Sequence, residues 1–80
     1  MLTKDLLSNS SYNPAAFLDA VIKRLNLKND AALSRTIDIA PPALSKVRSK
    51  IMPVGPALAL RVMEATGASM KDLYRWMGVL

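Results

Sequence analysis

Residues 29–50, NDAALSRTIDIAPPALSKVRSK, contain two short segments of helical periodicity separated by a very short break. The first, about 29–37, begins at Asn29, a residue type that commonly caps helices. The second, about 41–49, begins with two prolines, which suit the first turn of a helix because the N–H groups there have no intrahelical partner. Two helices joined so closely must cross steeply to share a core, so the stretch predicts a helix-turn-helix.

The rest of the chain is divided into helical segments in the same way. Asn13 and Pro14 predict the start of a helix over about 14–26. Gly55 and Pro56 open a further helix that Gly67 ends, and Ser69 with Asp72 predicts a capping box at the start of the last helix. No segment shows convincing strand periodicity. The expected fold is all-α, a compact bundle of about five short helices.

The length of 80 residues predicts one domain, near the lower limit for a chain that must bury its own core. We expect the domain to span residues 13–80, with residues 1–12 forming an N-terminal arm or a short helix. The N-terminus has no leader-like apolar core, and no stretch approaches the about 20 apolar residues that span a bilayer. The expected location is therefore cytoplasmic, with no membrane association.

The composition argues against catalysis. Histidine and cysteine are both absent, and the six carboxylates include no clustered pair. These absences remove the usual acid/base and nucleophilic groups, together with the Cys/His clusters that hold zinc or iron. We expect no enzymatic activity, no metal, no other cofactor and no small-molecule ligand.

The net charge of +5 is concentrated in one part of the chain. Residues 23–50 contain seven basic and two acidic side chains, a net charge of +5, whereas residues 1–22 sum to −1 and residues 51–80 to +1. A clustered basic region is typical of a protein that binds a polyanion, although it also suits an ordinary solvated surface.

The quoted stretch resembles the helix-turn-helix of the phage repressor and Cro-like family, also called the XRE or lambda-repressor-like family. The resemblance rests on the spacing of small, apolar and turn residues: Leu33, Ser34, Ile37, Asp38, Ile39, Leu44 and Val47. It extends more loosely from Leu18 to Met77, because the helix count and order match the family's five-helix bundle.

Three positions depart from the family pattern. Asp38 replaces the usual glycine at a left-handed turn position, which aspartate tolerates better than most residues. Asp30 replaces a glutamine that commonly approaches the DNA backbone, and its carboxylate would repel a phosphate. Ala40 replaces the usual hydroxyl cap of the second helix, so the rigid prolines that follow are expected to substitute for that cap.

The resemblance implies a sequence-specific DNA-binding transcriptional regulator, expected to be a repressor. It would dock the helix at about 41–49 in the major groove of double-stranded DNA and act as a homodimer on an inverted-repeat operator. The residues expected at base edges are Pro41, Pro42, Ser45, Lys46 and Ser49. Those expected at phosphates are Lys28, Asn29, Arg35, Arg48 and Lys50. The expected dimer interface is the apolar C-terminal helix, with Tyr74, Trp76, Val79 and Leu80.

Several alternatives stay open at this point. Ser45 suits a solvent-facing position as well as a base contact, and Arg35 could pair with Asp38 or Asp19 instead of a phosphate. Trp76 suits the core or a dimer interface better than base stacking. The whole bundle could also be a small protein-interaction module, such as an antitoxin-like or anti-defence partner, that binds an acidic protein through its basic face.

Overall fold

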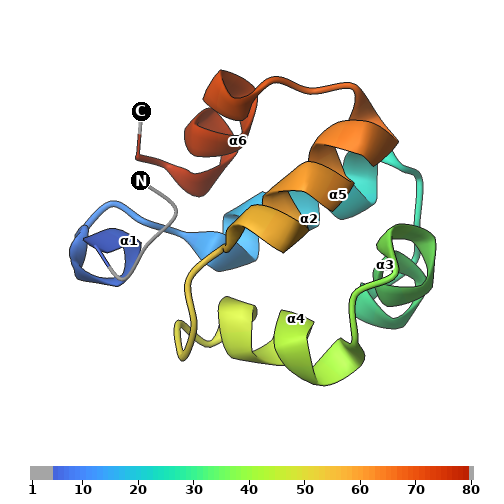
Figure 1. Ribbon diagram of the computed structural model, residues 1–80, viewed down its shortest axis with the longest axis horizontal. Helices are drawn as coiled ribbons and strands as arrows, with labels where there is room; N and C mark the ends of the chain where they lie inside the picture. The colour runs from blue at the N-terminus through green and yellow to red at the C-terminus, as the bar shows by residue number, and fades with distance from the viewer. Residues whose placement is uncertain (1–4, 80) are drawn as a thin grey trace.

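A computed structural model describes residues 5–79 of the chain, which form six helices and no strand (Figure 1). The helices are α1 (Asp5–Ser8), α2 (Pro14–Arg24), α3 (Asp30–Ile37), α4 (Pro41–Arg48), α5 (Pro56–Thr66) and α6 (Met70–Met77). The all-α prediction is confirmed, with α1 as an additional short helix. In this part of the chain, no helix has the length and apolar character needed to cross a membrane.

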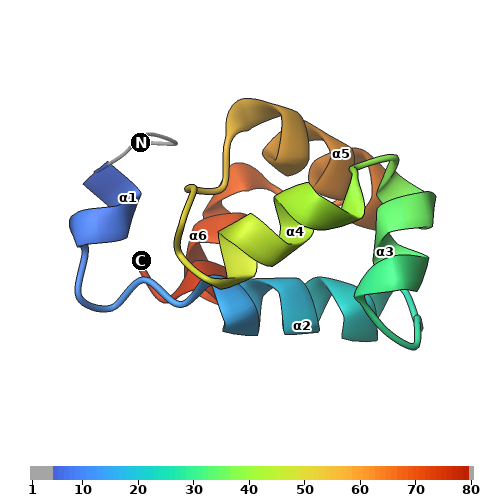
Figure 2. The same ribbon diagram turned by 90° about the horizontal axis from the view of Figure 1, so that it is seen from below.

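The bundle is built around α2, which packs against α4, α5 and α6. Figure 1 shows α6 on one side of α2 and α5, with α3 and α4 on the other. Figure 2 looks onto this second side and shows α4 lying across the front of the molecule between α2 and α5. One helix, α4, is therefore held from behind by its neighbours while its outer side faces solvent.

Three of the predicted caps form as expected. The side-chain oxygen of Asn13 accepts a hydrogen bond from the Ala16 N–H at 3.0 Å, and Asn29 accepts one from the Ala32 N–H at 2.9 Å. Ser69 begins α6 with the complete capping box. These caps satisfy N–H groups that have no partner within their helices, which fixes where each helix begins.

Two helices end slightly earlier than predicted. Helix α2 ends at Arg24 instead of residue 26, because Asn26 adopts the left-handed conformation (φ 56°). Helix α4 ends at Arg48 instead of residue 49 and is followed by Lys50 in the same conformation (φ 64°). In both cases the N–H of the following residue reaches back to a carbonyl five positions earlier, a pattern that ends a helix abruptly.

The turn between α3 and α4 is closed from both sides. Asp38 takes the left-handed conformation (φ 55°) that the sequence predicted for it. The Ile39 N–H donates to the Ser34 carbonyl at 3.1 Å, and the buried Ser34 hydroxyl donates back to the Ile39 carbonyl. Arg61 of α5 adds a hydrogen bond to the Ile37 carbonyl at 3.2 Å. The three-residue connection therefore has one well-defined path.

The core is one cluster to which all six helices contribute. Its fully buried side chains include Phe17, Leu18 and Val21 of α2, Leu33 of α3, Leu44 of α4, Val62 of α5 and Leu73 of α6. The helix faces predicted from periodicity are thus the ones that are buried.

The segment before residue 13 is part of this core. Leu6 and Tyr12 are buried, and the Tyr12 hydroxyl accepts a hydrogen bond from the Val54 N–H at 3.3 Å. The Asn13 N–H donates to the Met77 carbonyl at 2.7 Å, which joins the segment to the end of α6. Of the two expectations for residues 1–12, the structure shows the short helix, over Asp5–Ser8. The first four residues lie outside the part that the structure describes.

Replacing Tyr12 with phenylalanine tests this attachment. The change removes the hydroxyl and leaves the Val54 N–H without its acceptor, so we expect Tyr12→Phe to lower the free energy of unfolding by about 1 kcal/mol. Tyr74→Phe is the matched control, because the Tyr74 hydroxyl has no hydrogen bond within residues 5–79. Chemical denaturation of the three proteins measures both effects, and equal stabilities would contradict the role of the Tyr12 hydroxyl.

A pH dependence should accompany this hydrogen bond. Burial raises the pKa of Tyr12 above its ordinary value of 10.0, although the Val54 N–H opposes the shift. A raised pKa in the folded state gives stability that is fully present below about pH 10 and is lost as the pH rises through the folded-state value. The stability advantage of the wild type over Tyr12→Phe should therefore shrink in alkaline solution. A constant difference from neutral to alkaline pH would contradict the buried, protonated phenol.

Candidate nucleic-acid interface

The outer face of α4, together with its C-cap residue Ser49, contains all five residues that the sequence predicted at base edges. Pro41, Pro42, Ser45, Lys46 and Ser49 are each exposed, whereas Leu44 and Val47 on the opposite face are buried. The helical repeat produces this division, because positions three and four apart lie on one side of a helix. We call these five exposed residues the α4 face.

The α4 face offers few but free polar groups. The Ser49 hydroxyl donates to the Ser45 carbonyl at 2.9 Å, which leaves its oxygen available as an acceptor. The Lys46 ammonium has no hydrogen bond or ion pair within residues 5–79. Ala40 provides no side-chain cap, so α4 starts from its two prolines as predicted. The face is narrow and rigid at its start, and the Lys46 ammonium can donate hydrogen bonds from it.

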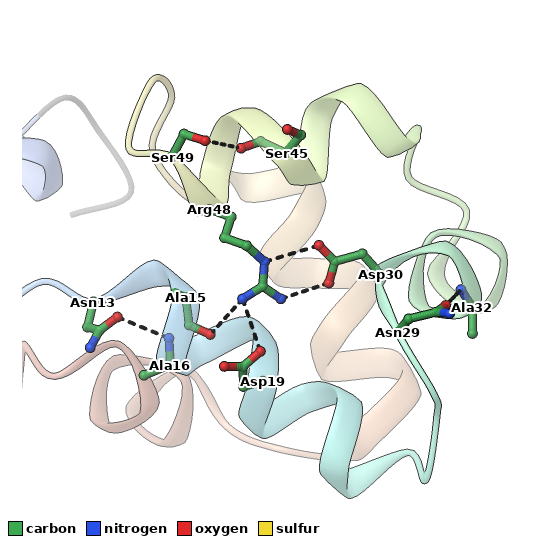
Figure 3. A network of polar contacts seen from close by, with 10 residues as sticks. All are labelled: Asn13, Ala15, Ala16, Asp19, Asn29, Asp30, Ala32, Ser45, Arg48 and Ser49. Carbon is green, nitrogen blue, oxygen red and sulfur yellow. Dashed lines mark hydrogen bonds and ion pairs between the residues drawn. The ribbon is translucent and has the colours of Figure 1, made fainter.

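Arg48 points in a different direction from the α4 face. Figure 3 shows its side chain extending away from Ser45 and Ser49 toward α2 and α3. Its Nε and Nη2 atoms donate to the two carboxylate oxygens of Asp30 at 3.0 and 2.7 Å. Nη1 donates to Asp19 at 3.0 Å, with a longer contact to the Ala15 carbonyl at 3.4 Å. The guanidinium thus joins the end of α4 to the start of α3 and to α2.

This geometry revises the expectation that Arg48 binds a phosphate. The side chain is 29% exposed, and its donors are already committed to two carboxylates. The hydrogen bond to Asp30 contributes most to raising the pKa of Arg48, and burial opposes it. The ion pair also reduces the repulsion that was expected between Asp30 and a phosphate. A carboxylate paired with a guanidinium repels a nearby phosphate far less than a free carboxylate does.

The other predicted phosphate contacts divide into two kinds. Lys28, Arg35 and Lys50 are exposed, and none of them has a hydrogen bond or ion pair in the described part of the chain. Arg35 does not pair with Asp38, which instead lies 3.4 Å from Arg61. Asn29 is exposed too, but its side-chain oxygen caps α3, so its amide group is what it can offer to a phosphate.

Lys50 occupies an unfavourable backbone conformation. It is the left-handed residue that follows Ser49, the C-cap of α4, in a conformation that costs side chains other than glycine about 1–2 kcal/mol. Asn26 and Gly78 fill the equivalent positions after α2 and α6, and both residue types tolerate this conformation better than lysine. Lysine at this turn therefore lowers local stability. This cost suggests that the positive charge of Lys50 has a functional role.

The predicted dimer residues of the C-terminal segment are largely committed to the monomer. Tyr74, Trp76 and Val79 are half-buried and pack against the core cluster. The Arg24 guanidinium lies 4.7 Å from the centroid of the Trp76 ring, a cation–π contact within the chain. Leu80 lies outside the described residues. Among residues 5–79, the exposed large hydrophobic side chains are instead those of Ile51, Met52 and Leu60, none of which the sequence predicted at an interface.

No group of three or more acidic side chains within residues 5–79 is arranged to hold a metal ion. In comparisons of the chain with protein-family models, curated proteins and solved structures, nothing matches.

The role of Arg48 can be tested by a charge-conserving change. Arg48→Lys keeps the positive charge but cannot donate the paired hydrogen bonds to Asp30. We expect it to lower the free energy of unfolding by about 1–2 kcal/mol, because charged carboxylates lose their partner. Arg35→Lys is the control and should change stability by less than about 0.5 kcal/mol, since Arg35 is exposed and unpaired. Thermal unfolding that distinguishes neither variant from the wild type would remove Arg48 from this structural role.

Proposed function

We propose that the protein is a sequence-specific DNA-binding regulator that docks α4 in the major groove and acts as a homodimer. The observation that supports the proposal most directly is the separation of side chains on α4. Leu44, Val47 and Arg48 face the bundle, while a narrow exposed face with one unpaired lysine points to solvent. Such a helix, held from behind and joined to α3 by a short turn, has the geometry of a reading helix in the major groove.

The residues of this surface divide into readers and anchors. Lys46 can donate to guanine O6 or N7. Ser45 can donate or accept at a base edge, whereas Ser49, whose hydroxyl proton is bonded to the Ser45 carbonyl, can accept. The rings of Pro41 and Pro42 give the start of α4 an apolar surface suited to a thymine methyl group.

The unpaired cations Lys28, Arg35 and Lys50 would then hold phosphates on either side of the groove. Their contacts would fix the position of α4 on the duplex without reading sequence. A repressor of this kind acts by occupying an operator that overlaps a promoter. Because it must reach that DNA, the proposed location is the cytoplasm.

Selection of duplexes from a random-sequence library by the purified protein tests the proposal. At near-physiological salt, repeated rounds should enrich an inverted repeat with half-sites about one helical turn apart. The affinity for the enriched site should fall steeply with salt, because each phosphate contact releases counterions. Background binding without an enriched sequence would overturn the proposal, and binding to an acidic protein through the same surface would then become the leading explanation.

Lys46 provides the sharpest test of base reading. Lys46→Ala should reduce the discrimination between the enriched site and random DNA by about 1–3 kcal/mol, because a base-specific donor is lost. Lys71→Ala removes the same charge from α6, on the opposite side of the bundle, and should leave discrimination unchanged. Fluorescence anisotropy with both DNAs measures the difference. An equal loss of affinity for the two DNAs would assign Lys46 to the phosphates instead.

Two substitutions at Lys50 separate its charge from its backbone strain. Lys50→Gly and Lys50→Ala both remove the charge, and each should lower the slope of log affinity against log salt by about 1. Lys50→Gly should also raise the free energy of unfolding by about 1 kcal/mol relative to Lys50→Ala, because glycine adopts the left-handed conformation without strain. A salt slope equal to that of the wild type in both variants would exclude a phosphate contact at Lys50.

A further inference from the structure

One exposed apolar patch lies beside the α4 face. Within residues 5–79, the exposed large hydrophobic side chains are Ile51, Leu60 and Met52, at 69%, 59% and 38% exposure. All three belong to residues 51–60, IMPVGPALAL, a run without any ionisable side chain. Clustered exposed apolar side chains commonly mark an interaction surface. We call this run and its exposed side chains the 51–60 patch.

The patch contains a hollow as well as projecting side chains. A cavity of about 140 Å³ opens between α4 and the start of α5, lined by Val47, Leu58, Met52 and Ala57 among others. Ala57 is a neighbour of Leu60 on the surface of α5, three positions apart, and Ile51 directly precedes Met52. The hollow and the projecting side chains therefore belong to one continuous surface.

The size of the hollow indicates what it can hold. Sites for small-molecule ligands usually measure about 300–1,000 Å³, well above this volume. An apolar cavity of about 150 Å³ holds a group the size of benzene. The hollow is therefore suited to a single apolar side chain of another polypeptide.

We propose that the 51–60 patch binds the same patch of a second copy of this chain, forming a two-fold dimer. A two-fold interface uses the same surface on both subunits. That surface must therefore offer both a projecting side chain and a hollow that accepts the partner's side chain. The 51–60 patch meets this requirement, because the exposed Ile51 directly precedes Met52, which lines the hollow that the partner's Ile51 would enter. The inference deepens the proposed function, since it identifies where the homodimer would be held together.

The charges around the patch favour a second copy over other partners. Two molecules with a net charge of +5 repel one another, and an uncharged surface is where they can approach most closely. Neither DNA nor an acidic protein would find a cation within the patch. At its borders, Lys50 and Glu64 have opposite charges and no ion pair within the described residues. An antiparallel arrangement of two copies places these unlike charges in the same region at both ends, and their attraction favours this register without committing the Lys50 ammonium to an ion pair.

The position of the patch also suits the proposed DNA complex. Ile51 comes three residues after the last residue of α4, so a two-fold axis through the patch lies near the same end of both α4 helices. The two α4 faces can then meet one side of a duplex, as paired half-sites require. Dimerisation through α6 would instead use the side of the bundle away from α4.

Sedimentation equilibrium of the full chain without DNA tests the interface, from about 10 µM to about 1 mM protein, a range that reveals weak association. The wild-type mass should rise from 8.7 kDa toward twice that value. Ile51→Asp and Leu60→Asp should each remain monomeric throughout. Ala65→Asp is the matched control, because it adds the same charge at an exposed position on a different face of α5, and it should associate as the wild type does. Circular dichroism checks that all three variants keep the fold.

Three results would overturn the inference. The first is a wild-type protein that stays monomeric at every concentration. The second is a dimer that both patch substitutions leave intact, and the third is an Ala65→Asp variant that associates as weakly as the two patch variants. The test is independent of DNA binding. A monomer that still enriches a half-site would overturn this interface and leave DNA recognition standing. A dimer that depends on the patch but enriches no DNA sequence would support this interface and overturn the proposed DNA recognition.

Discussion

The three-residue connection between α3 and α4 is the constraint on which the rest of the molecule depends. Each helix has eight residues, too few to be stable alone in water. They are stable together because Asp38 turns the chain, and Ser34 and Ile39 bond in both directions across the turn. The short turn makes the helices cross, and the crossing buries their apolar side chains against α2 and α5. The position and the direction of α4 follow from this turn and from the crossing of the two helices.

The basic residues near α4 have two different tasks. Arg48 uses its planar donor group within the molecule, where it satisfies two carboxylates from other helices. Lys46 and Lys50 remain free at the surface, the second in a backbone conformation that disfavours lysine. This separation matters because a net charge counts all cations equally, whereas only unpaired ones are available to a polyanion. The basic surface available to a polyanion is therefore smaller than the composition implies.

An uncharged surface begins where this basic one ends. Lys50 is followed directly by the exposed Ile51 and by the run that forms the hollow beside α5. The two surfaces differ in the partners that suit them, since free cations attract phosphates and a hollowed apolar surface accepts an apolar side chain. Their adjacency connects the two proposals physically, because a contact between two copies at residues 51–60 also fixes the distance between their α4 helices.

The sequence by itself determined the all-helical fold, the caps at Asn13, Asn29 and Ser69, and the outer face of α4. Each of these depends on residues within about one or two helical turns of one another, so periodicity and capping rules suffice. Only the tertiary structure decided the partners of Arg48, which lie 18 and 29 residues away, and the contact of Tyr12 with Val54 across 42 residues. It also packed the half-buried Trp76 against the core and next to the Arg24 guanidinium, and exposed Ile51 and Leu60 instead. Which charges are paired and which apolar side chains remain outside depends on how helices pack, and local sequence does not specify that packing.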